Sequence, residues 1–341
     1  MKNFFGKQWK LGWIISLVLL VVILVLVFLN FKSGSKTAAP AQVVATLAPT
    51  EAASAALETA PAATAEPTPV ATETAALDIG SARTSEIDGM EQVFVPAGEF
   101  LMGTNDTEAK ITVTGGRAYP EVPQFTYSLD AFWIDKLEVT NSQYAACIAA
   151  GACTEPHNLG FSPNLHTDYF TNPAFSNYPV VWVNWFQARD YCTWAGRRLP
   201  TEAEWEKASR GTDGQKYPWG NDPVTGDRAN FCDVNCTRTI ANPIFNDGYA
   251  DVAPVGSFPL GASPYGALDM SGNVWEWTST LIMDYPYVAT DGREDPNTLG
   301  ERVWKGGPWS NGIWWMRSSV RYRALDIYSW YVLGLRCVAT P

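Results

Sequence analysis

Two stretches of the chain carry side chains that bind hard cations. In "ALDMSGNVWEWT", Asp269 and Glu276 are carboxylates seven residues apart, and Gly272 permits a tight turn that would direct its own carbonyl and that of Val274 at one point. Calcium takes six to eight oxygen ligands, backbone carbonyls included. The stretch therefore predicts a calcium site, although a tryptophan-flanked strand in which Glu276 accepts backbone hydrogen bonds explains it equally well.

A second set of oxygen ligands is divided between "RANFCD" and "NDGYAD". Asn230 and Asp247 could supply side-chain oxygens, and Phe231 and Tyr249 could supply carbonyls, to another calcium ion. Asn and Asp are also frequent turn residues in Gly-rich loops. Turn formation accounts for this pattern as well as metal binding does.

The histidines give no comparable signal. His157, His166 and Asp168 match the composition of a two-His, one-carboxylate iron site. All three fall in one loop without a predicted element to fix them, so we expect solvent-facing loop residues. A nucleophilic triad is not indicated either, because Ser310 has no histidine close in sequence and no G-x-S-x-G elbow occurs.

The stretch "KGGPWSNGIWWMRSSVRYR", residues 305–323, contains three tryptophans and three arginines but no Cys, His, Asp or Glu. Tryptophan rings can line a groove for a peptide or a carbohydrate. Large aromatic side chains are more often part of a core. The composition therefore permits binding, and it lacks the side chains that carry out most catalysis.

Regular elements are predicted where hydrophobic alternation or capping patterns occur. "EQVFVPAGEFLMG" predicts two short antiparallel strands, and "FWIDKLEVT" predicts another strand from Phe132. Helices are expected after the N-caps Thr140, Asn184 and Thr201, the last with Glu204 completing a capping box. Almost ninety residues rich in Gly, Pro, Asn and Asp follow Gly211, and a chain this long needs cations or disulfides to organise it.

Six cysteines, an even number, are typical of disulfides in an extracytoplasmic domain, although the sequence alone does not fix their pairing. The close pairs Cys147/Cys153 and Cys232/Cys236 could each form a local loop, which would leave Cys192 and Cys337 as the third pair. Zinc binding by Cys232 and Cys236 is disfavoured because neither histidine lies nearby.

The N-terminal part has a different composition. Residues 11–31 are uncharged and apolar over a length that matches a bilayer core, which predicts a transmembrane helix. Lysines flanking this segment favour a cytoplasmic tail at 1–10; a cleaved signal peptide is the alternative. Residues 32–86, rich in Ala, Thr and Pro, predict a disordered stalk. We therefore expect a single-pass cell-membrane protein with an extracytoplasmic domain at 87–341.

The net charge of −11 argues against nucleic acid as a partner, because binding to nucleic acid calls for a basic face. It leaves open a neutral, acidic or divalent-cation partner. The membrane, through the N-terminal segment, and a peptide or glycan ligand are the partners that the sequence suggests.

A series of motifs resembles the formylglycine-generating enzyme, or sulfatase-modifying factor, family. In chain order they are "VFVPAGEFLMG", "VVWVNWFQARDYCTWAGRRLPTEAEWEKASRG", "YPWGN", "GALDMSGNVWEWT", "RVWKGGPWS", "RYR" and "LGLRCV". The resemblance implies an irregular α+β, C-type-lectin-like domain with two calcium ions bound at the two sets of oxygen ligands described above. It also implies a disulfide between Cys192 and Cys337.

The sequence departs from this family at its catalytic cysteines. Family enzymes oxidise a sulfatase cysteine to formylglycine with copper bound by two cysteines, whereas this chain offers residues near Asn311 and, aligned on "RYR", Ser319. Copper(I) needs soft thiolate ligands, so copper is not expected and no catalytic residue is assigned. The candidate binding residues of the altered cleft are Trp309, Asn311, Trp314, Trp315 and Arg317.

Three functions therefore remain. The first is a family scaffold that retains calcium and uses its cleft to bind a peptide or glycan. The second is a formylglycine-type oxidase or related oxygenase whose metal ligands are not recognised. The third is a structural or signalling ectodomain.

Overall fold

The computed structural model describes residues 77–106, 121–158, 160 and 166–341. The predicted cytoplasmic tail and transmembrane helix, and most of the predicted stalk, lie outside these residues. Within the described part of the chain, no helix is both long enough and apolar enough to cross a bilayer.

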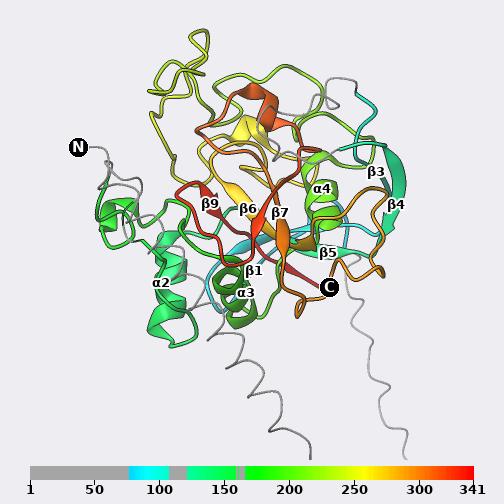
Figure 1. Cartoon of the computed structure of the whole chain (residues 1–341), viewed down its shortest axis with the longest axis horizontal. Coiled ribbons are helices and arrows are strands. Elements are labelled where there is room, and N and C mark those ends of the chain that lie inside the picture. The colour runs from blue at the N-terminus through cyan, green and yellow to red at the C-terminus, as the bar shows by residue number, and fades with distance from the viewer. Residues whose placement is uncertain (1–76, 107–120, 159, 161–165) are drawn as a thin grey trace, which may run out of the picture. The chain divides into compact units, whose positions relative to one another are not determined.

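In the part of the chain that the structure describes, three small sheets form a mixed, sheet-rich fold with few helices (Figure 1). The first has the order β1 (Ala82–Thr84), β2 (Glu91–Val95), β5 (Phe132–Asp135) and β10 (Val338–Ala339). The second pairs β3 (Gly98–Met102) with β4 (Phe125–Leu129). The third has the order β8 (Tyr322–Leu325), β7 (Glu301–Lys305), β6 (Trp275–Leu281) and β9 (Leu333–Gly334). Within it, only the β6–β9 pair is parallel.

The α-helices of the described residues begin at the predicted caps. They are α2 (Asn141–Ala149), α3 (Trp185–Trp194) and α4 (Glu202–Arg210), and each has a complete capping box, at Thr140, Asn184 and Thr201 respectively. The described residues also form the short 3₁₀ helices η2 (Pro173–Phe175), η3 (Pro259–Gly261) and η4 (Ile313–Met316). The structure confirms the three predicted helix starts. They could be predicted from the sequence because each capping contact joins residues three positions apart.

Other predicted features differ from the structure. β2 and β3 are not paired with each other, because β2 joins β5 and β3 joins β4. The strand that starts at Phe132 ends at Asp135 and does not continue to Thr140. β1 lies inside the predicted stalk and pairs with β2, so the folded part of the chain begins before residue 87.

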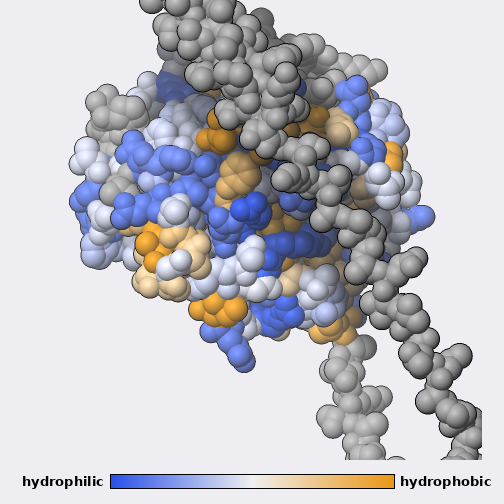
Figure 2. Space-filling view, turned by 60° about the horizontal axis from the view of Figure 1, so that its bottom comes forward, coloured by the Kyte–Doolittle hydropathy of each residue, from blue (hydrophilic) through white to orange (hydrophobic). Residues whose placement is uncertain are grey.

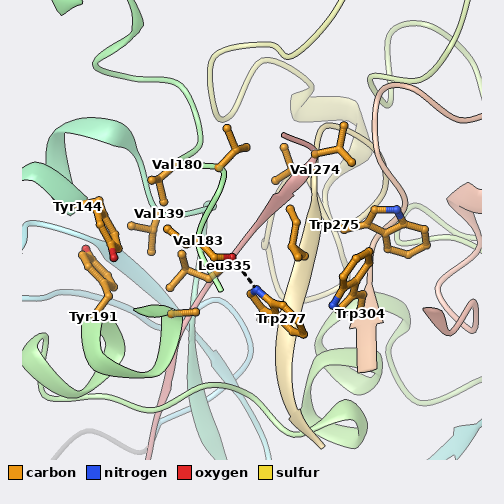
Figure 3. Close-up of a cluster of buried hydrophobic side chains, with 14 of the residues drawn as sticks. Val139, Tyr144, Val180, Val183, Tyr191, Val274, Trp275, Trp277, Trp304 and Leu335 are labelled. Atoms are coloured by element: carbon orange, nitrogen blue, oxygen red, sulfur yellow. Dashed lines mark hydrogen bonds between the residues drawn. The ribbon is translucent and has the colours of Figure 1, made fainter. Parts of the chain in front are cut away.

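The largest group of buried hydrophobic side chains lies between the third sheet and helices α2 and α3 (Figure 3). Trp275 and Trp277 of β6 contact Trp304 of β7, with ring centroids 6.4 and 5.3 Å away. Trp277 Nε1 donates to the Val183 carbonyl at 3.0 Å, the dashed line in Figure 3. These rings bury a large apolar area, which rigidifies the sheet that carries the site, although Trp304 Nε1 is buried without a hydrogen-bond partner among the described residues.

Three disulfides connect the irregular parts of the domain. They join Cys147 to Cys153, Cys192 to Cys337 and Cys232 to Cys236. These are the pairs expected from the spacing and the resemblance. The second disulfide closes a loop of 145 residues and fixes α3 to the C-terminal strand region.

Exposed hydrophobic side chains do not form a broad continuous patch where the surface is visible. On the part of the face shown in Figure 2, hydrophobic residues lie in small groups among hydrophilic ones. This distribution is normal for a folded surface. Hydrophobicity alone therefore does not identify a binding site on this face.

Candidate functional site

The candidate site is the segment from Lys305 to Arg323, here called the tryptophan segment, which connects β7 to β8. Its first turn packs on the "DMSGNVWE" stretch: Gly272 N donates to Gly306 O at 3.0 Å, and Trp309 N donates to Asn273 O at 2.8 Å. Gly307 has a φ of 73°, and a Cβ atom there would lie 2.3 Å from the Trp315 carbonyl oxygen. The segment can fold back on itself only with glycine at this position.

Two cations of the tryptophan segment are held by acids of α4. Lys305 Nζ lies 2.9 Å from Glu206, and Arg321 Nε lies 2.5 Å from Glu202, with all four side chains fully buried. Buried charges persist only when they are paired and hydrogen-bonded. These cations therefore fix the segment to α4 and are not presented to a ligand.

Arg317 is held in the same way. Its two terminal nitrogens each lie 2.9 Å from a Glu121 oxygen, and its guanidinium lies 4.1 Å from the centroid of the Trp314 ring. Both ion-paired side chains are 3% exposed or less. Burial raises the pKa of Glu121 above its ordinary value, against the opposing effect of the Arg317 charge. Sequence reasoning missed Glu121, which is 196 residues away from its partner.

The predicted cleft residues therefore divide into two groups. Arg317 and Trp309 are buried, whereas Asn311, Trp314 and Trp315 are partly exposed. The two adjacent indole rings are nearly perpendicular, with centroids 5.0 Å apart. The structure thus brings an amide and two aromatic rings to the surface of the tryptophan segment.

The residues at the two positions where the family resemblance places copper-binding cysteines are not suited to bind copper. Ser319 is buried, and its Oγ donates to Glu121 at 2.6 Å. Asn311 uses its backbone carbonyl to accept from Cys232 N at 2.9 Å. The three disulfides account for all six cysteines of the chain, so its described residues include no free thiol. Hydroxyl and amide oxygens are poor ligands for copper(I).

The structure brings together the predicted calcium ligands of "RANFCD" and "NDGYAD". Asp247 accepts from Phe231 N at 3.0 Å and from Tyr249 N at 2.8 Å, and Asn230 directly precedes Phe231. Burial raises the pKa of Asp247 to about 7, and the nearby Asp233 carboxylate contributes. A divalent cation would offset both effects, because it stabilises the ionised carboxylates.

The predicted calcium ligands in "ALDMSGNVWEWT" already form more hydrogen bonds and ion pairs with other protein groups. Both Glu276 oxygens accept from Arg336 at 2.7 Å, and one also accepts from Trp205 Nε1 at 2.6 Å. Asp269 accepts from Gly256 N at 2.6 Å, and burial raises its pKa to about 6. The carbonyls of Gly272 and Val274 belong to the same turn. A cation here would have to share Glu276 with a guanidinium.

Glu138 is a further buried acid that sequence reasoning missed. Its carboxylate accepts from Asn273 Nδ2 at 2.7 Å and from Val274 N at 3.3 Å. Burial, followed by the charges of Asp269 and Glu276, raises its pKa well above the ordinary value. Glu138 therefore supports the backbone of the predicted calcium turn.

The histidines do not form a site in the part of the chain that the structure describes. His157, His166 and Asp168 are all exposed, and His166 Nε2 lies 3.6 Å from Asp251. No group of three or more His, Cys, Asp or Glu side chains among the described residues could hold a metal ion. A metal site built mainly from backbone carbonyls would not require such a group of side chains.

Comparison with protein-family models places residues 79–341 in the sulfatase-modifying factor enzyme 1-like domain. The formylglycine-generating enzyme of Mus musculus is 30% identical over 288 residues, which cover 73% of this chain and 75% of the relative. The inactive C-alpha-formylglycine-generating enzyme 2 of Bos taurus is 31% identical over 268 residues, with 68% and 79% covered.

Among solved structures, PvdO from Pseudomonas aeruginosa aligns with a TM-score of 0.59 and 24% sequence identity. The alignment covers 78% of this chain and all of that chain. This likeness shows the fold alone.

Proposed function

The chain belongs to the family of sulfatase-modifying factor enzyme 1-like domains, and on this basis we propose that it binds a peptide or glycan ligand and does not oxidise cysteine. One observation carries the proposal: every cysteine is in a disulfide, while oxygen-bearing side chains stand at the two positions expected to bind copper. Fold and function separate readily in such scaffolds.

The exposed part of the tryptophan segment supports a binding role. The side chains of Trp314, Trp315 and Asn311 are all partly exposed, and the two indole rings are adjacent. Aromatic surface with a few placed polar groups is typical of recognition sites. The buried ion pairs of Lys305 and Arg317 hold the segment without any ligand.

The cellular setting is part of the same proposal. Residues 11–31 would anchor the chain as a single-pass membrane protein, and the domain would face outside the cytoplasm. Three disulfides support an oxidising compartment. The C-type-lectin-like character of the fold and the two bound calcium ions also belong to this proposal. The calcium ions would organise the loops at Asp247 and Asp269.

Two assays on the full chain test the proposal. The first incubates it with copper, oxygen and a sulfatase-derived cysteine peptide; we expect no aldehyde by mass spectrometry. The second measures binding to peptide and glycan arrays, where Trp314→Ala or Trp315→Ala should abolish the signal. Trp194→Ala is the matched control, because Trp194 is also partly exposed but belongs to α3.

The outcomes separate the three functions. Aldehyde formation would refute the proposal and favour an oxidase with unrecognised ligands. Failure to bind any probe, together with no aldehyde, would favour a structural or signalling ectodomain. Binding that survives both tryptophan substitutions would place the site elsewhere on the domain.

A further inference from the structure

Arg238 differs from the other cations near the tryptophan segment. Lys305, Arg317 and Arg321 are buried against carboxylates, whereas Arg238 is exposed. Within the described part of the chain, Arg238 takes part in no ion pair. The chain has a net charge of −11, and Arg238 is a positive charge that remains at its surface without a carboxylate partner among the described residues.

Two aromatic residues hold the guanidinium in place. Arg238 Nη2 donates to the Tyr331 hydroxyl, and the guanidinium carbon lies 6.0 Å from the centroid of the Trp309 ring. Cation–π contact and a hydrogen bond restrict the side chain, so less conformational entropy is lost when it binds an anion. The remaining guanidinium donors can then pair with a carboxylate or sulfate.

Further aromatic rings extend the surface beside Arg238. Tyr331 lies 6.2 Å from Trp182, 6.4 Å from Trp309 and 5.3 Å from Trp330, measured between ring centroids. The rings of Trp182, Trp330 and Tyr331 are partly exposed. The Tyr331 ring plane is inclined by 49° to that of Trp182 and by 76° to that of Trp330, so the three rings do not form one flat surface.

Trp182 adopts a backbone conformation that a bulky side chain rarely takes. Its φ is 63°, in the left-handed region, and its N–H donates to Trp330 O while its carbonyl accepts from His157 N, both at 3.0 Å. Asn or Gly would occupy this region with less strain. Strain of this kind is concentrated at functional sites. The Trp182 ring packs against the main hydrophobic cluster and against Tyr331, and these contacts hold it in this conformation.

Arg238 is also connected to the tryptophan segment through the backbone. Its carbonyl accepts from Ala241 N at 3.1 Å, and the next residue, Asn242, donates its N–H to Cys232 O at 2.9 Å. Cys232 in turn donates to Asn311 O at 2.9 Å. The Arg238 loop is therefore fixed next to Asn311, one of the proposed binding residues.

We infer that Arg238, Tyr331 and Trp182 form a subsite for an anionic saccharide unit, in which the guanidinium binds a carboxylate or sulfate and an aromatic face packs against the sugar ring. This inference rests on the proposed binding function and specifies the ligand class. Rings and one fixed cation suit a sugar ring with a charged substituent better than an extended peptide, whose backbone would need a row of hydrogen-bonding partners.

The test compares three trisaccharides that differ only in the terminal residue: glucuronate, 6-O-sulfated glucose and glucose. Binding to the full chain in nanodiscs is measured by calorimetry at low and high salt. We expect at least one of the two anionic probes to bind about tenfold or more tightly than the glucose-terminated probe, with the preference falling as salt rises. The two anionic arms distinguish carboxylate from sulfate.

Substitutions at the subsite test whether it causes the preference for anionic probes. Arg238→Gln should remove it, and Arg238→Lys should keep part of it. Arg189→Gln is the matched control, because Arg189 also lies over an aromatic ring, 5.3 Å from the Phe186 centroid, but on α3. Trp182→Asn should weaken the binding of all three probes while leaving the ratio between the anionic and the neutral probes unchanged, because it removes an aromatic face and leaves the Arg238 charge in place.

The results also separate this inference from the proposed function. Equal binding of all three probes that is lost in Trp315→Ala would overturn the anionic subsite and leave the proposed function intact. A preference that persists in Arg238→Gln would overturn the role of Arg238. Absence of binding to every probe would overturn the subsite and remove the glycan branch of the proposed function.

Discussion

Replacement of Glu121 tests whether the charges of the tryptophan segment are structural. In Glu121→Met, the Arg317 guanidinium stays buried without its carboxylate, and its remaining hydrogen bond is the 3.1 Å contact from Nε to Trp314 O. Removing one partner of a buried ion pair costs about 3 to 5 kcal/mol. With a urea m-value of about 3 kcal/mol/M, the unfolding midpoint should fall by about 1 to 1.7 M.

The double variant Glu121→Met/Arg317→Met should recover most of this loss, because replacing both charges with apolar groups avoids burying either one. We expect a free energy of unfolding within about 2 kcal/mol of the wild type, because the buried Ser319 hydroxyl still loses its Glu121 acceptor. Ser319→Ala is the control: it removes one hydrogen bond to Glu121 and should cost about 2 kcal/mol. Urea unfolding followed by tryptophan fluorescence measures all four proteins.

Two results would refute this reasoning. If Glu121→Met cost no more than Ser319→Ala, Arg317 would have another way to satisfy its charge. If the double variant were as unstable as the single one, the pair would act through packing and not through charge. In the first case, Arg317 would return as a candidate ligand-binding residue.

Two further predictions concern metal and disulfides. Calcium should raise the melting temperature of the wild type by mass action and raise that of Asp247→Asn by less, because the second site at Asp269 remains; scanning fluorimetry with calcium and with chelator measures both, and an unaltered wild-type curve would contradict both calcium sites. Replacing Cys192 and Cys337 with Ala should cost about 5 kcal/mol in urea unfolding, against about 2 kcal/mol for Cys147 and Cys153, because the loops span 145 and 6 residues. Equal losses would show that loop entropy does not control these disulfides.

The sequence predicted those features that depend on neighbours close in the chain. The caps at Thr140, Asn184 and Thr201 are examples, because each contact joins residues three positions apart. Strand pairing was harder: β2 and β3 are adjacent in sequence, yet each pairs with a strand more than twenty residues away. Local alternation predicts that a strand forms but not which strand becomes its partner.

The candidate site shows the same limit. Its residue types were recognisable, but the partners of its charges were not, since Glu121 and Arg317 are 196 residues apart. Arg238 was missed for the same reason, because it lies 93 residues from Tyr331. A lone Arg in a polar loop carries no sequence signal of its position in space.

The separation of supporting from reacting positions explains how a family scaffold could lose thiol chemistry and keep its shape. Gly307 permits the turn, and the pairs of Lys305 with Glu206 and Arg321 with Glu202 hold the two ends of the tryptophan segment. None of these contacts requires sulfur at positions 311 or 319. Under the proposed function, replacing thiols there would remove soft metal ligands without exposing a buried charge, and the remaining surface would be free to acquire a binding role.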